Sequence, residues 1–109
     1  MNDQPDPNEV LILEKGYKLV LEGKTYAALN HFHDVASRTP VTRNTAVAMQ
    51  TLGILHRTMK QLETSVADLE KALDMAQTLE ETELEASILD DLKKSRDLIK
   101  PRRQKNRKV

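Results

Sequence analysis

Cysteine is absent from the sequence, and glycine, proline and aromatic residues number only three, four and three. Without cysteine the chain forms neither a disulfide framework nor a thiolate metal site. No apolar stretch approaches the roughly 20 residues that span a bilayer. The first ten residues lack the basic-then-apolar order of a secretory signal. We therefore expect a cytoplasmic protein with one small folded domain.

The residues that are abundant favour helices. Ala, Leu, Glu, Lys, Gln and Met fill the stretches between the few glycines and prolines, among which Gly23, Pro40 and Pro101 mark helix ends. This pattern predicts five helices, over residues 9–22, 25–37, 42–59, 62–79 and 82–99. Joins this short make neighbouring helices antiparallel, so we predict an all-α fold of helical hairpins.

Charge is distributed unevenly along the chain. Residues 100–109 carry six basic residues and no acid, so residues 1–99 have a net charge of −6. We expect a disordered segment at 1–8, a helical domain at 9–99 and a basic disordered tail at 100–109. The basic side chains considered for the tail are Arg102, Arg103, Lys105, Arg107 and Lys108.

The basic tail has several interpretations. Three roles are compatible with its charge. It could be a solubilising segment, it could fold back onto acidic helices of its own or a neighbouring chain, or it could contact nucleic acid or acidic lipid. Because it contains no aromatic residue, any nucleic-acid contact would be through phosphate, non-specific and salt-sensitive.

The sequence repeats itself with a shift of 37 residues. This shift aligns Gly16 with Gly53, and it also aligns Phe32 with Leu69. A glycine inside a helix costs about 1 kcal/mol relative to alanine, so its recurrence needs a reason. Close packing of the two helices of each hairpin supplies that reason.

These residues resemble the tetratricopeptide repeat. The family pattern is matched first by Gly16, Ala28, Phe32 and Pro40, then by Leu52, Gly53, Leu69 and Ala72. In a third, incomplete unit, Leu92 takes the leucine position and Lys93 the glycine position. Lys15 and Ser65 depart from the pattern. The resemblance covers residues 9–99 and implies about two and a half repeats in a short right-handed superhelix.

In this family the first helix of each pair lines a concave surface where ligands bind. The positions that match by resemblance are Val10, Leu13, Tyr17, Val20, Val47, Gln50, Ile54 and Arg57, with Asp90, Lys94 and Asp97 from the last helix. The lysines and asparagines that clamp a carboxylate in some relatives are missing here. The remaining apolar strip suits a partner helix, an extended peptide or a second copy of the chain.

The first and last helices differ in pattern. Residues 9–22 are apolar nearly all round, so we expect something to cover the side that neighbouring helices leave free. In residues 82–99 we expect Ala86, Leu89, Leu92 and Ile99 to face inward and the acids, Asp91 included, to face solvent.

No pattern of residues predicts catalysis. His31 and His33 are two apart, so on a helix they point about 200° apart and cannot chelate one ion. We expect these residues and His56 to be structural. The acidic run 80–85 has no glycine for a calcium loop, and no nucleophile elbow is present. We expect no enzyme activity, metal or cofactor.

The sequence thus predicts a non-enzymatic interaction module, an adaptor, scaffold or chaperone-like protein. Its partner would be a protein or peptide, or a second copy bound through the first helix. The alternative is a nucleic-acid-associated regulator that acts through the basic tail.

Overall fold

The computed structural model describes the backbone of residues 7–107 and the side chains of residues 11–99. That part of the chain contains five helices and no strand. The helices are α1 (Pro7–Leu21), α2 (Thr25–Ala36), α3 (Arg43–Thr58), α4 (Leu62–Thr78) and α5 (Thr82–Arg107). The predicted all-α class with five helices is confirmed. None of these helices is both long and apolar enough to cross a membrane.

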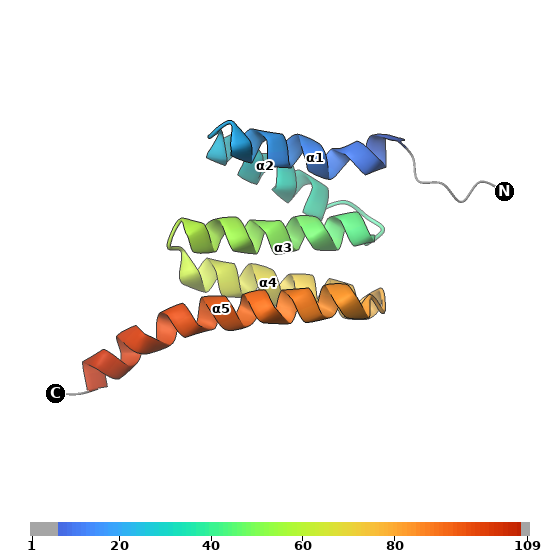
Figure 1. Ribbon diagram of the computed structural model, residues 1–109. Helices are drawn as coiled ribbons and strands as arrows, with labels where there is room; N and C mark the ends of the chain where they lie inside the picture. The colour runs from blue at the N-terminus through green and yellow to red at the C-terminus, as the bar shows by residue number, and fades with distance from the viewer. Residues whose placement is uncertain (1–6, 108–109) are drawn as a thin grey trace.

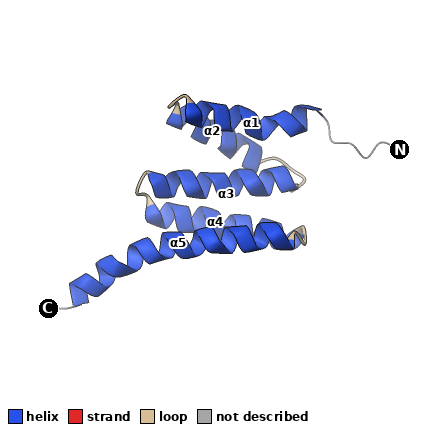
Figure 2. Cartoon of the chain, in the orientation of Figure 1, coloured by secondary structure: helices blue, strands red, loops and turns tan. Residues whose placement is uncertain are grey.

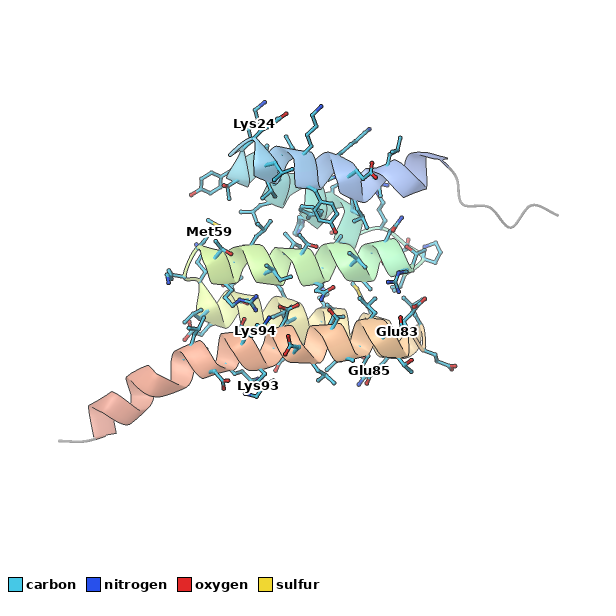
Figure 3. All side chains as sticks on the ribbon, viewed as in Figure 1. Lys24, Met59, Glu83, Glu85, Lys93 and Lys94 are labelled. Carbon is cyan, nitrogen blue, oxygen red and sulfur yellow. The ribbon has the colours of Figure 1, made fainter. Side chains whose placement is uncertain are left out.

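Successive helices run antiparallel and lie side by side, each packed against the next (Figure 1). Short loops make all the connections (Figure 2). Lys24 and Met59, at the turns after α1 and α3, lie at one end of the molecule, and Glu83 lies at the other (Figure 3). The array is elongated, with principal extents of 65 × 32 × 18 Å.

Three of the four turns use the same backbone device. A residue in the left-handed conformation follows α1, α3 and α4, namely Gly23 (φ 77°), Lys60 (φ 67°) and Glu80 (φ 57°). The next amide in each turn donates to a carbonyl five residues back: Lys24 to Leu19 (2.9 Å), Gln61 to His56 (2.9 Å) and Glu81 to Ala76 (3.0 Å). This is the Schellman helix end, in which only glycine avoids a steric cost.

The helix bounds differ from prediction at both ends of the chain. α1 begins at Pro7, two residues earlier than expected, because the fixed φ of proline suits the first helical position. Residues 1–6, the rest of the predicted disordered segment, lie outside the described residues.

The predicted end of the last helix at Ile99 is wrong, because α5 continues through Pro101 to Arg107. A proline inside a helix removes one backbone hydrogen bond and bends the axis. Figure 1 shows α5 bending away from the other helices toward its C-terminal end.

The two glycines of the repeat have equivalent surroundings. A Cβ atom on Gly16 would lie 2.3 Å from Cζ of Phe32, and one on Gly53 would lie 2.5 Å from Cγ of Leu69. Phe32 and Leu69 are themselves fully buried. In both hairpins, therefore, a large side chain of the second helix occupies the space that the glycine leaves open. The 37-residue shift predicts this equivalence.

The inward face of α5 differs from the prediction. Leu84, Ile88 and Leu92 are buried, whereas Ala86 and Leu89 are exposed. Ile99 is half-buried. The prediction failed because the buried stripe includes two polar residues, Asp91 and Ser95, which interrupt its apolar periodicity.

Lys93 follows Leu92 on the outer side of α5. Its side chain is 74% exposed, and its ammonium donates to Asp97 Oδ2 at 2.9 Å. The hydrogen bond to Asp97 and the attraction of that carboxylate raise the pKa of Lys93 above its ordinary value.

Candidate binding groove

A groove with a volume of about 510 Å³ runs between α1, α3 and α5. Its lining residues are Tyr17, Val20, Leu21, Val47, Gln50, Thr51, Ile54, Leu55, Ser87 and Asp91. The fold therefore brings together five of the eight residues that the family resemblance assigned to partner binding: Tyr17, Val20, Val47, Gln50 and Ile54.

The other predicted residues lie elsewhere. Leu13 is half-buried against the hydrophobic core, and the side chain of Val10 lies outside the described residues. Arg57 is half-buried and engaged with α5. The side chains of the predicted basic tail, Arg102, Arg103, Lys105, Arg107 and Lys108, also lie outside the described part.

The contribution of α5 to the groove is not the predicted one. Asp90, Lys94 and Asp97 do not line it, and Ser87 and Asp91 do. Asp90 instead pairs with Lys94 at 3.2 Å on the exposed surface. The correct helical phase of α5, set by Leu84, Ile88 and Leu92, would have identified Ser87 and Asp91.

Leu21, Thr51 and Leu55 were also missed. Leu21 belongs to the apolar run of α1, and its exposure of 88% is the largest among the apolar residues of that helix whose side chains are described. Nothing in the sequence indicated on which side of α1 it would lie.

The α1 wall of the groove is apolar and partly open to solvent. Tyr17 is 40% exposed and Val20 is 37% exposed. The Tyr17 ring packs on the Phe32 ring with a centroid distance of 5.4 Å and an interplanar angle of 47°, which fixes its position. The surplus apolar surface expected on this helix is therefore present, and much of it faces the groove.

The α5 wall is polar, and its side chains are hydrogen-bonded to α3. The Gln50 side chain donates to Ser87 Oγ at 2.9 Å and to Asp91 Oδ2 at 3.0 Å. Arg57 donates to Asp91 Oδ1 at 3.1 Å and to the Asp91 backbone carbonyl at 3.0 Å. Asp91 is buried, and the Arg57 and Asp91 side chains are only 17% and 11% exposed.

Two fully buried serines extend this polar wall into the core. Ser65 donates to the Gly53 carbonyl at 2.7 Å, which uses its only proton. The 2.8 Å bond between Ser65 and Ser95 is therefore donated by Ser95, which in turn accepts from Arg57 at 3.3 Å. These bonds join α3, α4 and α5, and no buried polar side-chain atom in the described part lacks a partner.

Two of the three histidines contact the other helix of their hairpin. His31 Nε2 lies 2.6 Å from the Ile12 carbonyl, and His56 Nδ1 lies 2.6 Å from Asp68 Oδ2. Each contact joins the two helices of one hairpin. His33 is exposed. Among the described residues no group of three or more His, Asp or Glu side chains is placed to hold a metal ion.

Comparison of the chain with protein-family models, curated proteins and solved structures finds no match. The groove and the residues that build it are therefore the features that bear on function.

Proposed function

We propose that this chain is a non-enzymatic protein-interaction module with a tetratricopeptide-like fold. It binds a partner helix or peptide, or a second copy of itself, in the groove between α1, α3 and α5. The alternative, phosphate contact by the basic tail, involves side chains outside the described residues.

The repeated hairpins support this assignment. Gly16 under Phe32 and Gly53 under Leu69 repeat one packing arrangement at the interval that the sequence predicts. Arrays of such hairpins stack side by side and leave a continuous surface formed by the first helix of each pair. The groove lies on the corresponding helices, α1, α3 and α5.

The observation that carries the proposal is the apolar lining of this groove. Six of its ten lining residues are apolar, and three of them on α1 are exposed. Apolar side chains that converge on a concave surface with a polar edge are typical of helix-in-groove recognition. A short groove of this kind suits affinities on the order of micromolar.

NMR spectroscopy of the labelled protein tests the proposal. We expect backbone amide shifts in Tyr17, Val20, Val47 and Ile54 to change on addition of a Leu/Gln amphipathic helical peptide, or with rising protein concentration if a second copy binds. Tyr17→Glu should weaken either response, and Tyr26→Glu should not, because Tyr26 is 74% exposed and lies outside the groove.

The proposal fails if neither the peptide nor the protein concentration changes these amide shifts. It also fails if the two glutamate variants affect binding equally, because the response would then not depend on the groove.

A further inference from the structure

The polar wall of the groove has a defined hydrogen-bonding orientation, and it specifies the partner. The Asp91 carboxylate only accepts hydrogen bonds, so the Gln50 atom that faces it must be the amide nitrogen. Both amide protons are then used, one by Asp91 and one by Ser87. The side-chain oxygen of Gln50 therefore points away from these two partners and stays available as an acceptor.

The positive charge next to Asp91 is not part of the groove lining. Arg57 is not among the groove residues, and its bonds go to Asp91 Oδ1, the Asp91 carbonyl and Ser95 on α5. Asp91, in contrast, lines the groove and is the only charged residue among its described lining residues. Each Asp91 oxygen accepts one of these bonds and can accept another.

The groove thus offers apolar contacts on α1 and α3, and unfilled acceptors where Gln50 of α3 meets Asp91 of α5. Thr51 adds no free donor, because its hydroxyl donates to the Val47 carbonyl at 2.8 Å. Ser87 accepts from Gln50 and keeps one hydroxyl proton to donate, so the wall offers more acceptors than donors. The net charge of −6 over residues 1–99 also attracts a positively charged ligand. A ligand with donors and positive charge is complementary to this wall, and the charge of Asp91 and of the acidic body opposes a carboxylate.

We propose that the occupant of the groove is an amphipathic helix whose apolar stripe is bordered by lysine or arginine. The apolar stripe packs on Tyr17, Val20 and Ile54, and the basic side chain bonds to Gln50 and Asp91. This inference rests on the proposed function of the groove and adds the chemical class of the partner.

Three synthetic amphipathic helices test this inference on the full chain. They share one leucine stripe and carry lysine, glutamine or glutamate at the flanking positions. Fluorescence anisotropy should rank the affinities Leu/Lys, then Leu/Gln, then Leu/Glu, with about a tenfold difference between the first and the last.

A matched pair of charge variants distinguishes the groove from general attraction to the acidic body. Val20→Lys places a cation in the groove and should abolish or reverse the preference for the Leu/Lys peptide. Tyr26→Lys makes the same change in net charge at a more exposed position outside the groove and should leave the preference within about twofold. Circular dichroism checks that both variants remain helical.

The outcomes separate the two proposals. If all three peptides bind equally and Val20→Lys weakens them equally, the groove binds helices but does not select basic ones, and only this inference fails. If both lysine variants change the preference equally, the charge selection belongs to the whole body and the inference also fails. If groove substitutions alter no binding, the proposed function fails as well.

Discussion

At Gly16 there is no space for a methyl group. The Cβ of an alanine would meet three ring atoms of Phe32, the nearest at 2.3 Å, and this ring is fully buried and also contacts Tyr17. The ring cannot move without disturbing the α1–α2 hairpin. Alanine is normally the better helix former, so helix propensity predicts that Gly16→Ala stabilises the protein, whereas the packing predicts that it destabilises the protein.

We expect Gly16→Ala to lower the free energy of unfolding by about 2 kcal/mol, because overpacking exceeds the gain in helix propensity. Urea denaturation followed by circular dichroism measures the change. Phe32→Ala removes the ring that fills the space over Gly16, so adding Gly16→Ala to this variant should cost much less. An equal cost in both backgrounds would show that the contact between the two residues is not responsible.

Lys60 illustrates the opposite situation, a residue where glycine fits better. It is exposed and has φ of 67°, the conformation that Gly23 adopts at the equivalent turn. We expect Lys60→Gly to raise the free energy of unfolding by about 0.5–1 kcal/mol, after the entropy of the unfolded glycine is subtracted from the relieved strain. Thermal unfolding should show a higher midpoint. The neighbouring Gln61→Gly, at φ of −93°, should show a lower one.

At the scale of elements, α5 is held by polar contacts as well as by its apolar stripe. Asp91 and Ser95 bond to α3 and α4 through Gln50, Arg57 and Ser65. Such a network is stable only when all its members are satisfied, so the loss of one leaves buried partners unpaired. The attachment of α5 should thus be unusually sensitive to single polar substitutions.

The adjacent aspartates Asp90 and Asp91 provide a matched test. We expect Asp91→Ala to cost about 3 kcal/mol because it leaves Arg57 and Gln50 without their buried acceptor. Asp90→Ala removes only an exposed pair with Lys94 and should cost less than about 0.5 kcal/mol. Hydrogen exchange should show faster exchange of α5 amides in the first variant, and equal behaviour of the two would contradict the role of the network.

The sequence predicts the elements better than it predicts the faces they bury. Glycine, proline and the hairpin repeat locate α2, α3 and α4 to within one residue at each end. The burial of α5 was mispredicted because Asp91 and Ser95 look like solvent-facing residues until their partners on α3 and α4 are known. The same error concealed Ser87 and Asp91 as groove residues, since hydrogen bonds between distant segments leave no periodic signal.

At the scale of the whole molecule, the side-by-side arrangement produces an extended particle. The radius of gyration over Cα atoms is 15.5 Å, whereas a compact domain of about 100 residues has about 13 Å. We expect small-angle X-ray scattering of the monomer to give a value clearly above the compact one. A value near 13 Å would mean that the array closes on itself in solution.

The lysine on the outer side of α5 has a consequence for how far this architecture can extend. By the resemblance to the repeat, Lys93 follows Leu92 as Gly53 follows Leu52, and it takes the position at which Gly16 and Gly53 accept a large side chain of the next helix. A further helix laid on α5 in the same manner would have to bury a charged side chain that is now 74% exposed. We therefore expect Lys93 to disfavour a helix that packs on α5 as α4 packs on α3.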